Sequence, residues 1–227
     1  MHLLIPAAGS GKRMGVTGNK LLLEILGMPI ISWTLKAAQK SVSIEWVGII
    51  GQKCDFPRFE NILLSIGFSK KWQLIEGGET RQESVYQGLK SLPNSAKLVL
   101  IHDGARCLAT PSLFDQCSDS LLVYSALIAA IAVKDTIKIV DAERYIADTP
   151  NREQLWAAQT PQGFSVDLLK ECHAKAIALG WEVTDDAALF ERCQLPVKII
   201  EGEETNLKIT TPVDLAIAEY ILAQRID

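Results

Sequence analysis

The fold of this chain is decided by the stretch Met1-His2-Leu3-Leu4-Ile5-Pro6-Ala7-Ala8-Gly9-Ser10-Gly11-Lys12-Arg13-Met14-Gly15, in which a short apolar run passes directly into a loop of small and basic residues. The apolar run is typical of a buried first strand. The small residues let backbone N–H groups approach an anion closely, and Lys12 and Arg13 add positive charge. The spacing fits no GxGxxG fingerprint, which would need glycine in place of Met14, and no GxxxxGK[ST] loop. The stretch therefore predicts a strand that ends at a phosphate-binding loop, with a tight turn carrying two surface cations as the alternative.

Strands and helices alternate at short spacing after this stretch. Apolar runs predict further strands at residues 45–50, 72–75, 97–101, 126–133 and 197–200. Helical patterns lie between them, and Thr80 and Glu83 have the spacing of a capping box at the start of one helix. The alternation predicts an α/β fold, with a Rossmann-like, mostly parallel sheet flanked by helices.

The alternation of predicted strands and helices is interrupted at Lys134. Between residues 135 and 155 polar and apolar side chains alternate, and no helical pattern interrupts them. This pattern predicts a β-arm over residues 134–157 that protrudes from the main sheet and exposes its backbone edges unless another element covers them. With no linker or internal repeat in the sequence, we expect residues 1–227 to form a single domain.

The composition excludes several classes of function. The chain has 23 Lys+Arg against 27 Asp+Glu, whereas non-specific nucleic-acid binding needs a basic surface, so we expect no nucleic-acid partner. Its apolar runs are too short to span a bilayer and its first residues lack a secretory signal pattern, so we expect no membrane association. The five cysteines form no CxxC motif, which predicts reduced thiols and a cytoplasmic protein.

Charged residues recur where α/β folds bind ligands. Lys20 alone would be an ordinary surface lysine, but Arg13 and Lys20 flank the glycine loop and suggest a clamp on a polyphosphate. Asp103 lies just past the end of the fourth predicted strand, where it could bind a ribose hydroxyl or a hydrated Mg²⁺, or simply form an Asx turn. We interpret the neighbouring His102 as a packed strand residue and not as a catalytic base.

Taken in order, these segments resemble the 2-C-methyl-D-erythritol 4-phosphate cytidylyltransferases of isoprenoid synthesis, over nearly the whole chain. The matching motifs are Ala7 to Met14, Lys20, Gly77-Gly78-Glu79, Arg81, Ser84-Val85, His102-Asp103-Gly104-Ala105-Arg106, Asp135-Thr136, Arg152, Trp156, Thr160-Pro161-Gln162, Thr184-Asp185, Asn206-Leu207-Lys208-Ile209-Thr210, Pro212 and Asp214-Leu215-Ala216. The chain departs from the family pattern at Asn19 and Leu21, which replace proline and glutamine, at Cys107, which replaces proline, and at Glu79, which replaces aspartate.

The resemblance implies a fold of the nucleotide-diphospho-sugar transferase type, with an arm that serves dimerisation. It implies a homodimer with arm exchange, in which each arm reaches into the partner's active site. The implied reaction transfers CMP from CTP to 2-C-methyl-D-erythritol 4-phosphate, with Mg²⁺ or another divalent cation, and gives 4-diphosphocytidyl-2-C-methyl-D-erythritol and pyrophosphate. It belongs to the non-mevalonate pathway of isoprenoid precursors.

The resemblance also assigns the site residues. Arg13 and Lys20 would be catalytic. The nucleotide would be bound by Pro6, Ala7, Ala8, Gly9, Gly11, Lys12, Gly78, Glu79, Ser84, Asp103 and Gly104. The second substrate would be bound by Arg106, Thr136, Arg152, Thr160 and Lys208, with Thr136 and Arg152 coming from the partner. No metal ligand is assigned, although Asp103 is a candidate.

Other functions fit parts of the same pattern. A cytidylyltransferase for another alcohol phosphate, such as ribitol 5-phosphate, would share the loop, the lysine and the aspartate motif. A nucleotidyltransferase for a sugar 1-phosphate or an acidic sugar would differ in the base pocket and the arm. A non-catalytic nucleotide sensor would not need a full leaving-group clamp, and Met14 disfavours a Rossmann oxidoreductase.

Overall fold

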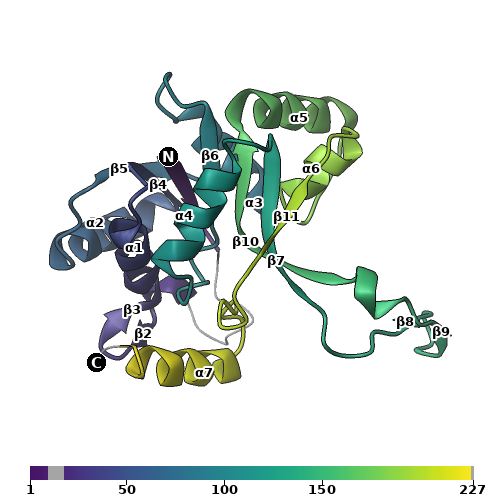
Figure 1. Ribbon diagram of the computed structural model, residues 1–227. Helices are drawn as coiled ribbons and strands as arrows, with labels where there is room; N and C mark the ends of the chain where they lie inside the picture. The colour runs from purple at the N-terminus through teal and green to yellow at the C-terminus, as the bar shows by residue number, and fades with distance from the viewer. Residues whose placement is uncertain (10–17, 226–227) are drawn as a thin grey trace.

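The computed structural model describes residues 1–9 and 18–225, and it is built around one seven-stranded sheet with the strand order β11-β7-β10-β6-β1-β4-β5. The strands are β1 (His2–Pro6), β4 (Trp46–Gly51), β5 (Lys71–Glu76), β6 (Leu98–Ile101), β7 (Ala126–Ala132), β10 (Trp156–Ser165) and β11 (Lys198–Glu201). The helices are α1 (Ile30–Lys40), α2 (Phe56–Ser65), α3 (Arg81–Lys90), α4 (Pro111–Ser120), α5 (Val166–Leu179), α6 (Ala187–Arg192) and α7 (Pro212–Ala223). Figure 1 shows the helices packed around the sheet, which confirms the predicted flanked α/β architecture.

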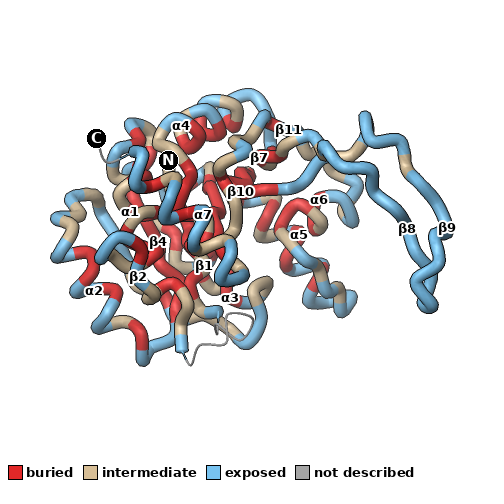
Figure 2. Tube along the Cα trace, turned by 90° about the horizontal axis from the view of Figure 1, so that it is seen from below, coloured by how far each residue is buried: buried red, intermediate tan, exposed pale blue. Residues whose placement is uncertain are grey.

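Strand β1 lies inside the sheet and divides the core into two layers. It pairs in parallel with β4 on one side and β6 on the other. Leu3 and Ile5 are fully buried in a cluster with α1, α2 and α4, whereas Leu4 is fully buried in a second cluster with α3, α5 and α6. This alternation follows from the two-residue period of a strand. The buried sheet is visible in Figure 2. It fixes the positions of the carboxyl ends of β1 and β6.

Strand β10 makes the sheet mixed, and the sequence did not predict it. It lies antiparallel between β6 and β7, whereas the other neighbouring pairs of the large sheet are parallel. Its polar residues Gln159, Thr160 and Gln162 are buried, so an apolar run does not mark it. Each of these side chains is instead hydrogen-bonded to a neighbouring segment, as buried polar groups require.

Local signals place the helix ends that border the later site. The predicted capping box is present at α3, where the Thr80 hydroxyl accepts from the Glu83 N–H and the Glu83 carboxylate accepts from the Thr80 N–H. A second box, formed by Thr211 and Asp214, begins α7. Such caps satisfy N–H groups that have no partner within the helix. Both helices therefore start at a defined point beside the sheet edge.

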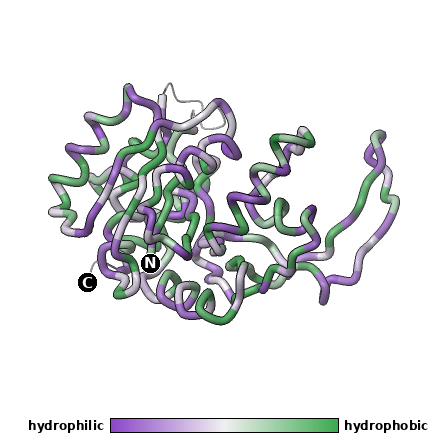
Figure 3. Tube along the Cα trace, turned by 90° about the horizontal axis from the view of Figure 1, so that it is seen from above, coloured by the Kyte–Doolittle hydropathy of each residue, from purple (hydrophilic) through white to green (hydrophobic). Residues whose placement is uncertain are grey.

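Residues 134–155 leave the body of the molecule, whereas Trp156 and Ala157, which the sequence analysis included in the arm, belong to β10 and pair with Ala132 and Ile131 in the main sheet. Two short strands, β8 (Ile139–Val140) and β9 (Ile146–Asp148), pair antiparallel in the arm. Residues 134–149 are all exposed, and Figures 1 and 2 show the arm extending away from the sheet. Figure 3 shows hydrophobic stretches within the arm, and Tyr145 and Ile146 are 73% and 64% exposed.

Two smaller strands, β2 (Glu24–Ile25) and β3 (Met28–Pro29), form a separate hairpin before α1. Pro29 therefore ends β3 and is also the N-cap residue of α1, which begins at Ile30.

None of the helices in the described ranges is both long and apolar enough to cross a membrane.

Candidate nucleotide-binding site

A pocket of about 240 Å³ opens at the carboxyl ends of β1 and β6. Its lining comes from five parts of the chain, namely the end of β1, the short 3₁₀ helix η2 (Lys20–Leu22), the start of α3, the segment after β6 and the segment before α7. The lining residues are Pro6, Ala7, Ala8, Gly9, Lys20, Leu21, Gly78, Glu79, Thr80, Arg81, Ser84, Asp103, Gly104, Ala105 and Lys208. The pocket thus brings together most of the residues assigned to the nucleotide, at the edge where α/β sheets bind ligands.

Asn19 places Lys20 at this pocket. Its side-chain oxygen accepts from the Leu21 N–H and caps the short 3₁₀ helix η2 (Lys20–Leu22), while its side-chain nitrogen donates to the Ala7 carbonyl at 2.7 Å and to Asp55 at 2.9 Å. The Lys20 ammonium donates to the Ile209 carbonyl at 2.7 Å. The departure from the family pattern at Asn19 therefore has a structural role, because one amide ties η2 to the end of β1.

Gly78 and Ser84 form the wall at the start of α3. The Gly78 N–H donates to the Ser84 hydroxyl at 3.1 Å, and Ser84 is 3% exposed. A Cβ atom on Gly78 would lie 2.4 Å from the Cβ of Glu83, so the capping box leaves no room for a side chain there. Glu79 is exposed at the rim, and its N–H donates to Glu83.

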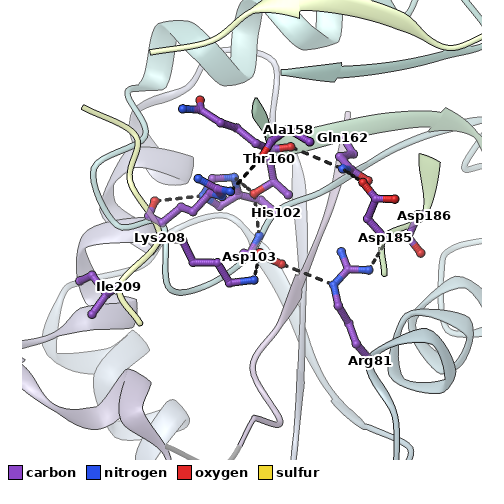
Figure 4. A network of polar contacts seen from close by, with 12 residues as sticks. Arg81, His102, Asp103, Ala158, Thr160, Gln162, Asp185, Asp186, Lys208 and Ile209 are labelled. Carbon is purple, nitrogen blue, oxygen red and sulfur yellow. Dashed lines mark hydrogen bonds and ion pairs between the residues drawn. The ribbon is translucent and has the colours of Figure 1, made fainter. Parts of the chain in front are cut away.

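Asp103 is the buried charge at the centre of the site. Its Oδ2 atom lies 2.7 Å from the Lys208 ammonium, and its Oδ1 atom lies 3.6 Å from Nε of Arg81 (Figure 4). Burial opposes ionisation of this carboxyl, but Arg81 and Lys208 outweigh that effect and lower its pKa to about 2. Asp103 is therefore a carboxylate throughout the neutral pH range.

His102 is held behind Asp103 and does not line the pocket. Burial lowers its pKa to about 4, so the ring is neutral near pH 7. Its Nε2 lies 3.1 Å from the Arg106 carbonyl, which can only accept, so Nε2 carries the proton. Its Nδ1 then accepts from the Thr160 hydroxyl, and the Thr160 oxygen accepts from the Asp103 N–H. His102 is thus a packed and hydrogen-bonded residue, as interpreted from the sequence.

The residues assigned to the second substrate are not all brought together within one chain. Thr160 is buried beneath Asp103, and Arg106 donates to the carbonyls of Asn206 and Ala158 beside the pocket. Thr136 and Arg152 lie exposed on the arm, where Arg152 donates to the Lys134 carbonyl. These two are absent from the pocket lining of their own chain.

Three of the assigned residues, Gly11, Lys12 and Arg13, lie outside the described residues, so their roles stay predictions.

Asp186 has a role at the site that its local sequence does not reveal. Asp186 directly precedes α6, which begins at Ala187, but its side chain makes no capping bond to that helix. Its carboxylate is 1% exposed and lies 2.8 Å from Arg81. Arg81 carried a signal, because it is one of the motif residues of the resemblance, but pairing across 105 positions cannot be read from local sequence.

Comparison with known proteins decides the family. The family model described as "IspD: 2-C-methyl-D-erythritol 4-phosphate cytidylyltransferase" matches residues 1–224. The chain belongs to the IspD family. This membership confirms the resemblance inferred from the sequence, and it makes the protein a cytidylyltransferase of isoprenoid precursor synthesis.

Individual IspD proteins match over their full length. The chain is 70% identical to 2-C-methyl-D-erythritol 4-phosphate cytidylyltransferase of Crocosphaera subtropica, with 99% of both chains covered. It is 66% identical to the enzyme of that name from Synechocystis sp., with 99% of this chain and 98% of the relative covered. The crystal structure of 4-diphosphocytidyl-2C-methyl-D-erythritol synthase from Anaerococcus prevotii superposes with a TM-score of 0.87 at 34% identity and covers 98% of this chain and 97% of that one.

The buried His102 predicts that this IspD protein loses stability in mild acid. The unfolded chain binds a proton at this imidazole below about pH 6.5, whereas the folded chain does so only below about pH 4. Between these values the unfolded state binds more protons, so the free energy of unfolding falls as pH drops through the window, by at most about 3 kcal/mol from this group. Urea unfolding at a series of pH values measures the slope.

His102→Gln supplies the control, because an amide can donate and accept while it does not titrate. The pKa of His2 is also lowered by burial, so His2→Gln measures the share of that second group. The lowered pKa of Asp103 changes the free energy of unfolding only below about pH 4, which is outside the pH window in which His102 acts. An unchanged acid slope in His102→Gln would contradict the prediction.

Proposed function

We propose that the pocket at the ends of β1 and β6 binds CTP and that the chain there transfers CMP to 2-C-methyl-D-erythritol 4-phosphate, releasing pyrophosphate. One observation carries this proposal. The pocket gathers Lys20, Lys208 and the Asp103 carboxylate around the small-residue end of β1, which suits a polyanion held for reaction. The names of the full-length relatives support the same pair of substrates.

The attack needs no general base. A phosphomonoester is largely dianionic near neutral pH, because its second pKa is about 6, so its oxygen can attack the α-phosphorus of CTP directly. The bond to the pyrophosphate breaks as the new P–O bond forms, and the electron pair leaves with pyrophosphate. His102 has no part in proton transfer in this scheme, since its two ring nitrogens are already engaged below the pocket.

The protein's contribution is charge stabilisation and positioning. Lys20, held by η2 and the Ile209 carbonyl, lies where an ammonium can stabilise negative charge on the reacting phosphates. Arg13 would complete the clamp. Lys208 orients a phosphate beside the line of attack, and Arg106 with Thr160 supports the part of the site that takes the second substrate.

The wall formed by Gly78, Glu79 and Ser84 faces the end of β1 and takes the cytosine ring. Cytosine presents an amino donor where uracil presents a carbonyl, so backbone acceptors at Ala7 and Ala8 distinguish the two bases. A uracil carbonyl facing one of these acceptors would find no donor there and would itself be left without a partner, which disfavours UTP.

A divalent cation fits this site, with Asp103 as the residue that would hold it. Within the described ranges no group of three or more His, Cys, Asp or Glu residues could bind a metal by itself. Mg²⁺ is commonly bound by one or two carboxylates together with substrate phosphates, and the ionised Asp103 at the pocket wall suits that arrangement. When bound, the cation neutralises charge on the triphosphate.

The arm completes the site of a second copy in this proposal. Thr136 and Arg152 lie on the arm and are absent from the pocket lining of their own chain. The arm also exposes apolar side chains such as Ile139 and Val140, which are 50% and 52% exposed, as expected for a surface that is covered by a partner. Arm exchange in a homodimer would bring Thr136 and Arg152 to the partner's second substrate.

A cytoplasmic location belongs to the same proposal. All five cysteines are unpaired, and Cys107, Cys117 and Cys172 are buried. Unpaired thiols persist in compartments that keep them reduced, of which the cytoplasm is the principal example.

Acceptor specificity tests the proposed reaction. We expect pyrophosphate release from CTP and Mg²⁺ with 2-C-methyl-D-erythritol 4-phosphate, and little with ribitol 5-phosphate or with UTP in place of CTP. An enzyme-coupled pyrophosphate assay measures all three rates. Preference for ribitol 5-phosphate would assign the related ribitol 5-phosphate cytidylyltransferase activity. If none of a panel of alcohol phosphates gave any pyrophosphate release, a nucleotide sensor would be indicated.

Lys20→Ala should lower kcat by about 10²- to 10³-fold, because removal of one preorganised charge contact at a reacting group has an effect of that size. The fold should be retained, since the side chain is at the pocket surface. Lys90→Ala, at the exposed far end of α3, is the matched control and should turn over at the wild-type rate. Near-wild-type turnover by Lys20→Ala would remove the lysine from the mechanism.

Mixed dimers test arm exchange. Lys20→Ala damages the pocket and Arg152→Ala damages the arm, so each homodimer should be nearly inactive. After mixing and subunit exchange, a heterodimer has one intact site, made of the pocket of one chain and the arm of the other, and about a quarter of wild-type activity should return. Activity that stays at the level of the separate variants would show that each arm serves its own chain or no site at all.

A further inference from the structure

A line of alternating charges runs from the pocket into the protein interior. It consists of Lys208, Asp103, Arg81 and Asp186, contributed by the segment before α7, the end of β6, the first turn of α3 and the segment before α6. The first three line the pocket, whereas Asp186 does not and is 1% exposed (Figure 4). The proposed reaction uses Lys208 and Asp103 but gives no role to the buried carboxylate at the far end.

Arg81 is shared unequally between its two carboxylates. A terminal nitrogen (Nη1) lies 2.8 Å from Oδ2 of Asp186, whereas Nε lies 3.6 Å from Oδ1 of Asp103. A guanidinium can grip a carboxylate with two parallel hydrogen bonds, and that grip is much stronger than one long contact. The closer contact with Asp186 therefore keeps Arg81 from closing on Asp103.

As a result, the Asp103 carboxylate can pair with a second cation, the ammonium of Lys208. Its Oδ2 atom accepts from the Lys208 ammonium at 2.7 Å, so one oxygen faces Arg81 and the other faces the lysine. If Arg81 gripped both oxygens, it would compete directly with Lys208 for the carboxylate. The position of the Lys208 ammonium thus depends on where Arg81 is held.

Asp186 also has a second, longer contact in the protein interior. Its Oδ1 atom lies 3.6 Å from Nε2 of His173, a residue that is 1% exposed and whose ring stacks on Tyr86 with ring centroids 5.3 Å apart. Burial opposes ionisation of Asp186, but Arg81 and His173 together lower its pKa below the usual value. A buried ion pair is weak evidence for a contribution to stability, because desolvation offsets the attraction, so this carboxylate calls for another role.

We propose that Asp186 is a positioning residue for the transfer reaction. It anchors the guanidinium of Arg81, and through Arg81 it keeps Asp103 available to hold Lys208 at the phosphate site. The inference rests on the proposed function for its effect on turnover, but the effect on Lys208 is a property of the protein alone. Without the anchor, Arg81 closes on Asp103 and releases the Lys208 ammonium.

Asp186→Asn tests the proposal, because it removes the anchoring charge with little change of shape. Acylation of Lys208 by a lysine-selective reagent, followed by mass spectrometry, should proceed at least about threefold faster in this variant, since a lysine side chain no longer held by a carboxylate is more accessible to the reagent, which reacts with the free amine. The kcat should fall about tenfold or more, while the KM for CTP should change less than about threefold. Thermal melting confirms that the protein compared is folded.

Two further variants separate positioning from a structural role. In Arg81→Gln/Asp186→Asn no guanidinium is present to close on Asp103, so Lys208 labelling should return to the level of Arg81→Gln alone. Asp185→Asn is the matched control, because the Asp185 carboxylate binds Gln162 and the Ala188 N–H on the same segment; labelling and kcat should stay within about twofold of wild type.

The proposal is overturned if Lys208 labelling is the same in Asp186→Asn as in the wild type, or if its increase persists in the double variant. Should Asp186→Asn fail to fold, Arg81→Lys gives the test. A lysine at position 81 keeps the positive charge but cannot make the two parallel hydrogen bonds of a guanidinium to the Asp103 carboxylate. Labelling and kcat within about threefold of wild type then support the proposal, and a drop in kcat of more than tenfold overturns it. Faster labelling of Lys208 in Asp186→Asn with an unchanged kcat would support the anchoring and would instead count against the proposed function of the pocket.

Discussion

The arrangement of the pocket depends on one buried carboxylate, that of Asp103 at the end of a central strand. An ionised group that has lost most of its water needs opposite charge close by, and here Lys208 and Arg81 supply it. These two cations come from segments that are far from Asp103 in sequence. The carboxylate therefore joins the end of β6 to the start of α3 and to the segment before α7, and the pocket lies where the three meet.

The local charge of the site differs in sign from that of the whole chain. The formal net charge is −4, yet the described pocket lining has three basic residues, Lys20, Arg81 and Lys208, against two acidic ones, Glu79 and Asp103. Part of this positive charge is balanced internally, by Asp103 and Asp186, before any ligand arrives. A nucleoside triphosphate would thus meet a set of cations already fixed in place by buried acids. The charged side chains therefore need less reorganisation when negative charge develops during transfer.

The fold could be predicted from the sequence where a helix or strand is marked by a local sequence pattern. The buried strands β1, β4 and β7 are apolar runs, and the start of α3 has a capping box, so these were placed correctly. Strand β10 escaped prediction because its buried part contains the polar residues Gln159, Thr160 and Gln162, whose burial is made possible only by partners elsewhere in the chain. Burial of a polar side chain is a tertiary property, and no periodicity reports it.

The sequence by itself determined the α/β class and the family, and it predicted the arm and the charged residues of the candidate site. These follow from short-range signals, namely apolar period, turn and cap residues, and an ordered set of motifs. Only the tertiary structure decided that Asp103 lies between Lys208 and Arg81, that His102 is a neutral residue beneath the pocket, and that Asp186 faces inward to Arg81 and not toward a helix end. The physical reason is that a charge or hydrogen bond acts through space over a few ångströms, and the chain brings residues separated by a hundred positions to that distance only when it folds.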